Sequence, residues 1–274
     1  MKARKKAPDI RSLRLFDTCV TLGRIVRAGT PECITADNVL AVLDKHDIAE
    51  ALVHHNEARV TRPRQPGNEA LLKDIKGMTR LHPVWTLEPP KSPDPAAARA
   101  MVAEMLGRGV KVARLMTSEA PPVLWLWDDL CTELEAHRVP CMLDFGVVAW
   151  PASSGATQGN PDNFGVQCLR EICLAHPDLP MVLSHVSGGL GLAYAVLPLM
   201  RRVPNLHMDI TSVVDYWRTA ATQIGPERVV FATGMPYYDP ATFISNVQYA
   251  HQIDADAKLK ICGDNMRAMM EAVR

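Results

Sequence analysis

The chain has 274 residues, and its 30 Lys and Arg residues balance its 30 Asp and Glu residues, so the formal net charge is zero. A neutral surface lacks the long-range positive potential that non-specific nucleic-acid binding needs, so we do not expect DNA or RNA as a partner. With 47% hydrophobic and 22% charged residues, the composition is typical of a globular protein and not of a disordered one.

The first fourteen residues carry the one marked charge asymmetry. Six basic residues against Asp9 give 6 − 1 = +5 there, which leaves −5 on the rest of the chain. We interpret residues 1–12 as a solvated basic arm in front of a single domain at 13–274. The sequence predicts neither a signal peptide nor a transmembrane helix, hence no membrane partner. The seven cysteines are odd in number and never spaced as Cys-x-x-Cys, which favours a reducing cytoplasm over a disulfide framework.

Short apolar runs alternate with longer amphipathic segments along the whole chain. The predicted strands cover eight ranges: 13–16, 51–54, 81–87, 110–115, 140–143, 181–184, 206–210 and 229–232. The predicted helices cover 35–46, 67–75, 95–106, 124–137, 163–175, 190–201, 212–224, 240–247 and 264–273, and Thr35 caps the first of them. Eight strand–helix units in a chain of this length predict a (β/α)₈ barrel, with a doubly wound sheet as the alternative.

One absent motif and one long segment bear on function. No Gly-x-Gly-x-x-Gly follows the first predicted strand, which argues against a dinucleotide-binding fold. Residues 147–161, rich in Gly, Ser, Ala and Asn, are too many for a simple connection after the fifth strand. We expect them to form a lid or a substrate loop.

Chemistry in a β/α-barrel is carried by the residues at the C-terminal ends of the strands. In this chain those positions hold polar residues of several types: Cys19, His54, Glu57, Arg114, Asp144, His185 and Asp209. Such a rim predicts a site for a small molecule.

Several motifs in order resemble one family. They are Phe-Asp-Thr-Cys-Val-Thr-Leu-Gly at 16–23, Val-Leu-Ser-His-Val-Ser-Gly-Gly at 182–189 and Glu-Arg-Val-Val-Phe-Ala-Thr-Gly-Met-Pro at 227–236. Together they resemble the amidohydrolase-related barrels, a branch of the amidohydrolase superfamily that includes decarboxylases and lactone hydrolases. The resemblance covers nearly the whole chain and implies the same barrel.

The departures from that family concern its metal. Metal-dependent members place a His-x-His pair after the first strand, where this chain has Cys19 and Thr21. The His that commonly ends the fifth strand corresponds to Asp144, and the Asp after the eighth strand corresponds to Gly234, so only His185 is kept. The resemblance therefore implies a degenerate metal site, and we expect no cofactor. The alternative is one divalent metal such as Zn²⁺ at Cys19, Asp144 and His185.

The predicted catalytic pair is His185 and Asp144. An imidazole titrates near working pH and suits a general acid or base, and Asp144 would orient it or share its proton. Arg114 offers a planar pair of donors for a substrate carboxylate. Each of these residues also has a structural alternative. His185 would hydrogen-bond a neighbouring backbone group, and Asp144 and Arg114 would form a structural salt bridge with each other.

The remaining predicted substrate-binding residues are less specific. His54 and His55 are adjacent, so only one of them can face the barrel, and we expect His54 or Glu57 to line the mouth. Cys19 is either a nucleophile or a small buried filler. Asp209 and Trp150 complete the set, Trp150 as an aromatic wall.

These residues predict a hydrolase or decarboxylase that acts on a small carboxylated substrate without the usual metal. The alternative is a non-catalytic barrel that binds a small molecule or a protein partner, since loss of ligand positions also accompanies loss of function. We further expect a homodimer to be possible.

Overall fold

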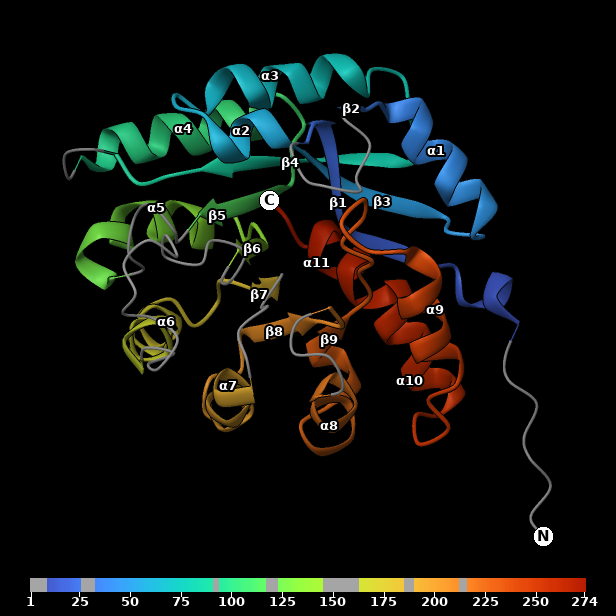
Figure 1. The fold of residues 1–274 in the computed structure, drawn as a ribbon. Helices are drawn as coiled ribbons and strands as arrows, with labels where there is room; N and C mark the ends of the chain where they lie inside the picture. The colour runs from blue at the N-terminus through green and yellow to red at the C-terminus, as the bar shows by residue number, and fades with distance from the viewer. Residues whose placement is uncertain are drawn as a thin grey trace, which may run out of the picture.

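The computed structural model describes residues 9–25, 33–90, 94–116, 123–144, 163–184, 190–211 and 216–274. In these parts a ring of parallel strands is surrounded by helices (Figure 1). The parallel strands are β1 (Phe16–Arg24), β3 (Glu50–His55), β4 (Leu81–Leu87), β5 (Val112–Met116), β6 (Cys141–Asp144), β7 (Met181–Ser184), β8 (Leu206–Asp209) and β9 (Val229–Val230). A short strand, β2 (Cys33–Ile34), pairs antiparallel with the end of β1.

The ring closes between β1 and the segment that follows β9. The amides of Thr18 and Thr21 donate to the carbonyls of Phe231 and Met235, each at 3.0 Å. A parallel bridge also joins Val20 to Met235. Parallel pairing from β1 through β3 to β9 together with this closure confirms the predicted (β/α)₈ barrel.

The helices lie outside the ring. They are α1 (Ala36–Lys45), α2 (Asn56–Val60), α3 (Gln65–Asp74), α4 (Pro95–Gly107), α5 (Leu124–Ala136), α6 (Asn163–Ala175), α7 (Leu190–Arg202), α8 (Tyr216–Gln223), α9 (Pro240–Gln248), α10 (Ala255–Leu259) and α11 (Asn265–Glu271). The predicted cap is confirmed, because Thr35 Oγ1 accepts from the amide of Asn38 at 3.2 Å. Within the described residues no helix is long and apolar enough to cross a membrane.

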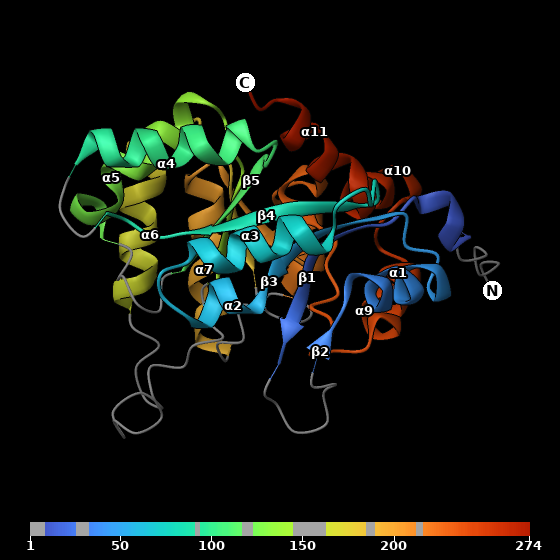
Figure 2. The same ribbon diagram turned by 90° about the horizontal axis from the view of Figure 1, so that it is seen from above.

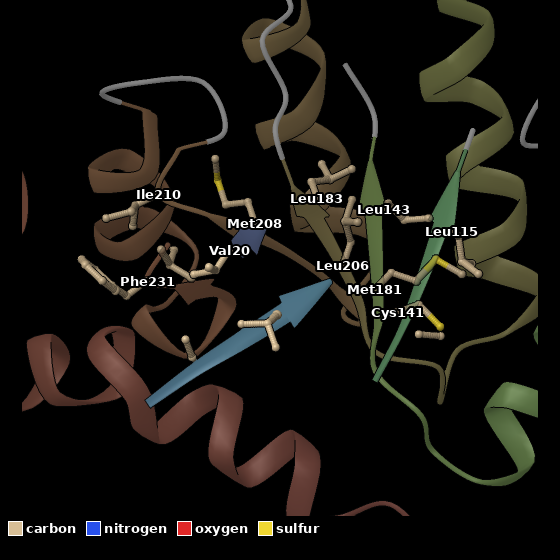
Figure 3. Close-up of a cluster of buried hydrophobic side chains, with 14 of the residues drawn as sticks. Val20, Leu115, Cys141, Leu143, Met181, Leu183, Leu206, Met208, Ile210 and Phe231 are labelled. Carbon is tan, nitrogen blue, oxygen red and sulfur yellow. The ribbon is translucent and has the colours of Figure 1, made fainter. Parts of the chain in front are cut away.

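The parallel strands are mostly buried on both of their faces, as is typical of a parallel barrel. One face packs against the helices and includes Leu115, Leu143 and Leu183, which Figure 3 shows among their neighbours. The other face lines the lumen. Its floor is a separate apolar cluster made of Phe16, Leu52, Val84, Val112, Met142, Val182, Val230 and Met266.

Helix α11 closes the end of the barrel at this floor. Figure 2 shows α11 at the end opposite the head of the β1 arrow. Arg267 donates from Nε to Glu50 Oε1 at 3.0 Å, and Glu50 Oε2 lies 2.8 Å from His82 Nε2. The guanidinium also lies over the ring of Phe16, 5.3 Å from its centroid. The site must therefore open at the other end, where the strands have their C-termini.

The first predicted strand is wrong in its extent. Residues Ile10–Leu13 form a 3₁₀ turn, and β1 runs from Phe16 to Arg24, so Asp17, Cys19 and Thr21 lie within a strand and not in a loop after it. The polar residues suggested a loop, but they bond inside the barrel, as described below. The short elements β2, α2 and α10 were not predicted. The basic arm up to residue 8 and the expected lid at 147–161 lie outside the described residues.

Candidate active site

A layer of polar side chains lies on the apolar floor. Two residues beyond four of the floor positions, toward the C-terminal strand ends, the chain carries His54, Thr86, Arg114 and Ser184, each at most 1% exposed. Side chains two residues apart in a strand share a face, so these residues belong to the lumen face of β3, β4, β5 and β7. This is the end of the barrel at which β/α-barrel enzymes hold their sites.

Arg114, His54 and Thr21 form a chain of hydrogen bonds across three strands. Arg114 Nη1 lies 3.3 Å from His54 Nδ1, and His54 Nε2 lies 3.0 Å from Thr21 Oγ1. A guanidinium can only donate, so His54 Nδ1 must accept. The ring proton is then on Nε2, which donates to the Thr21 hydroxyl. This assignment makes His54 a neutral imidazole held in one tautomer.

Cys19 contacts the same guanidinium. Its Sγ lies 3.9 Å from Arg114 Nη1, and the side chain is fully buried. Burial raises the pKa of the Cys19 thiol to about 12, against the opposing influence of Arg114, and the charge of Asp209 adds to the rise. The thiol is therefore protonated at neutral pH and is not a ready nucleophile.

Asp17 is a buried carboxyl group that the sequence analysis did not select. It accepts from the amides of Cys19 and Thr233 at 3.1 and 2.9 Å and from the Thr233 hydroxyl. Burial raises its pKa to about 6 although these hydrogen bonds act in the opposite direction. The available signal was an acidic residue directly after the predicted first strand, because a carboxyl group inside a barrel needs hydrogen-bond partners there.

Asp209 is the second buried carboxylate near this layer. Ser184 Oγ donates to its Oδ2 at 2.8 Å, and the amide and hydroxyl of Thr211 donate to its Oδ1 at 2.9 and 2.7 Å. Its negative charge raises the pKa of Asp17 and of Cys19, so the three groups share one electrostatic environment. Ser184 also hydrogen-bonds Cys19, which joins β7 and β8 to β1.

The structure therefore brings together four of the predicted site residues: Cys19, His54, Arg114 and Asp209. They come from β1, β3, β5 and β8, which are far apart in the sequence. The sequence analysis did not select Asp17 or Ser184, which bond directly to members of this group.

Glu57 is not part of this polar layer. It lies on α2, its side chain is 49% exposed, and its Oε2 is 4.0 Å from Nδ1 of His55. His55 points away from the lumen toward Asp74, whose Oδ2 is 3.7 Å from its Nε2. Of the adjacent histidines, His54 is thus the one that faces the barrel interior, as strand alternation requires.

Three predicted site residues lie wholly or partly outside the described residues. Asp144 is the last residue of β6 and pairs in register with Met116 and Ser184, but its side chain is not described. His185 and Trp150 are not described at all; His185 directly follows Ser184 in the sequence.

The described donors do not fit a divalent metal ion. In this part of the chain no three His, Cys, Asp or Glu side chains form a metal-binding group. Both ring nitrogens of His54 are engaged in hydrogen bonds, to Arg114 and to Thr21. A divalent ion about 4 Å from the Arg114 guanidinium would meet a repulsion of about 8 kcal/mol at an effective dielectric constant of about 20.

The barrel and its polar lumen define the class of protein as a parallel β/α-barrel with a buried polar layer toward the C-terminal strand ends. The sequence model described as "Amidohydrolase" matches residues 27–270, so the chain belongs to this amidohydrolase family. No curated protein matches the chain.

Solved structures of low sequence identity share the fold. The 5-carboxyvanillate decarboxylase of Sphingomonas paucimobilis is 16% identical with a TM-score of 0.71, over 96% of this chain and 100% of that chain. A second structure is a dihydroxybenzoic acid decarboxylase from a Polaromonas species, with bound manganese and the inhibitor 2-nitroresorcinol. It is 16% identical with a TM-score of 0.69, over 94% of this chain and 96% of that chain. The 2,6-dihydroxybenzoate decarboxylase from Rhizobium is 18% identical with a TM-score of 0.66, over 94% of this chain and 99% of that chain.

Proposed function

We propose that this chain decarboxylates a small aromatic carboxylate and does so without a metal ion. The observation that carries the proposal is the Arg114 guanidinium in the polar layer, beside the neutral groups Cys19 and His54. Solved structures with the same fold are named as decarboxylases of hydroxylated benzoates, which favours decarboxylation over hydrolysis.

Arg114 is proposed to hold the substrate carboxylate. Its side chain leaves β5 between the buried residues Ala113 and Leu115, so the guanidinium stands on a rigid element. The bond to His54 orients it, and the Thr21 hydroxyl in turn holds His54. A planar guanidinium binds a carboxylate through two parallel hydrogen bonds, which fixes the plane of the carboxylate as well as its position.

His185 and Asp144 remain the proposed acid/base pair. In the proposed reaction the bond between the ring carbon and the carboxylate breaks, and its electron pair stays on the ring carbon. A proton from His185 takes the place of the CO₂ that leaves, and water then returns a proton to the imidazole. Asp144 would orient the imidazole. The substrate-binding roles of Asp209, Glu57 and Trp150 remain proposals of the same kind.

The test is turnover of 2,6-dihydroxybenzoate and 5-carboxyvanillate, measured as CO₂ release, by the wild type and two variants. We expect His185→Asn to lower kcat by at least about a hundredfold with little change in KM, as for loss of a general acid. We expect Arg114→Met to raise KM and lower kcat together. Full activity of His185→Asn would refute its assigned role.

The second candidate is a non-catalytic barrel that binds a small molecule or a protein partner. It is favoured by the near-complete burial of Arg114, which the contacts to His54 and Cys19 explain without a substrate. Saturable binding of an aromatic carboxylate that depends on Arg114, with no CO₂ released from any substrate tested, would select this function over decarboxylation.

A further inference from the structure

Arg114 brings a permanent positive charge to the centre of the polar layer. Its side chain is 1% exposed, and Nη1 lies 3.3 Å from His54 Nδ1 and 3.9 Å from Cys19 Sγ. An arginine side chain does not lose its proton in a protein, so this charge persists at every pH of interest.

The groups around the guanidinium are arranged for this cation and not for a metal. Cys19 Sγ lies against Arg114 Nη1, and the lone pair of His54 Nδ1 points at the same guanidinium. The other side of the imidazole is bonded to Thr21. Cys19 and Thr21 occupy the two positions at which the family resemblance expects a His-x-His pair. Cys19 contacts the guanidinium directly, and Thr21 is linked to it through the imidazole of His54.

The two buried carboxyl groups that interact electrostatically with Cys19, Asp209 and Asp17, are also engaged. Both oxygens of Asp209 accept hydrogen bonds, from Ser184 on one side and from Thr211 on the other. Asp17 accepts three hydrogen bonds from Cys19 and Thr233. A metal ion bound here would have to replace these donors and also approach a like charge.

We propose that Arg114 excludes divalent metal ions from the lumen and serves there as the fixed cation in their place. In this proposal Arg114, a residue of β5, supplies the positive charge that a bound metal ion would otherwise supply. This inference rests on the metal-free part of the proposed function, but it makes no claim about turnover. Mn²⁺ binding therefore tests it separately from CO₂ release.

The test restores metal ligands with and without Arg114. The double variant Cys19→His/Thr21→His keeps the guanidinium, and a triple variant adds Arg114→Met. Mn²⁺ affinity is measured by isothermal titration calorimetry, and metal content by elemental analysis. We expect the wild type and the double variant to bind no stoichiometric Mn²⁺ and the triple variant to bind at least about a hundredfold more tightly than the double variant.

Two controls separate the effect of the Arg114 guanidinium from general effects of lost charge and of misfolding. Arg80→Gln in the double variant removes an equal charge from an arginine that pairs with Asp44 outside the lumen, and it should leave Mn²⁺ excluded. If the methionine variant does not fold by circular dichroism, Arg114→Gln replaces it, because glutamine still offers a donor to His54. Equal Mn²⁺ affinity of the double and triple variants, or stoichiometric Mn²⁺ in the wild type, would overturn the proposal.

Discussion

Titration of Asp17 makes the free energy of unfolding depend on pH. Its pKa is about 6 in the folded chain against 3.8 for an ordinary Asp side chain, so the folded state binds the proton more tightly than the unfolded state. Stability from this group is therefore present below about pH 4 and is lost as pH rises through 6. A shift of this size corresponds to about 3 kcal/mol.

We expect Asp17→Asn to remove this dependence. Asparagine keeps the shape and can still bond the amides of Cys19 and Thr233 while it no longer ionises. Urea unfolding of both proteins at pH 4.5 and at pH 7.5 measures the effect. Relative to the wild type, the variant should gain stability at the higher pH. An identical pH dependence of the two proteins would show that Asp17 does not titrate in this way.

Cys19 is expected to resist alkylation. Burial raises the pKa of its thiol to about 12 and also shields the sulfur from reagent. Cys33 is exposed and serves as an internal control. After iodoacetamide treatment of the folded protein at pH 8, peptide mass spectrometry should find Cys33 modified and Cys19 unmodified. Rapid modification of Cys19 would instead support a nucleophilic role for it.

At the scale of elements, α11 is held to the barrel floor by one partly buried ionic network of Arg267, Glu50 and His82. Burial alone would raise the pKa of Glu50, yet hydrogen bonds from His82 and Arg267 lower it overall. A lowered pKa means that this stabilisation is present at neutral pH and is lost as pH falls through the acidic range. The attachment of α11 to the barrel through Glu50 should therefore weaken at acidic pH.

The contribution of this network is measurable with a matched control. We expect Arg267→Met to lower the free energy of unfolding by about 1–3 kcal/mol, because it leaves the partly buried Glu50 without a charged donor. Arg99 pairs with Glu133 at a similar distance but is 72% exposed. Arg99→Met should cost about 0.5 kcal/mol or less. Equal losses in urea unfolding at pH 7 would contradict the assigned role of α11.

At the scale of the whole molecule, the regular alternation of strands and helices was sufficient to predict the barrel. The helix at Asn163–Ala175 was predicted with its observed bounds. Arg114 was predicted in the correct strand but at its end, whereas it is the third of the five residues of β5. Both depend on local periodicity. The polar β1 was misplaced because Asp17 bonds Thr233 in the segment after β9 and Thr21 bonds His54 on β3, and no local pattern reveals partners so distant in the sequence.

The central claim is catalysis without a metal ion, and the direct measurement is CO₂ release from 2,6-dihydroxybenzoate by protein treated with a chelator and shown by elemental analysis to be metal-free. We predict that turnover equals that of the untreated protein, is unchanged by added Mn²⁺, and is lost in Arg114→Met. Turnover that disappears on metal removal and returns with Mn²⁺ would contradict it.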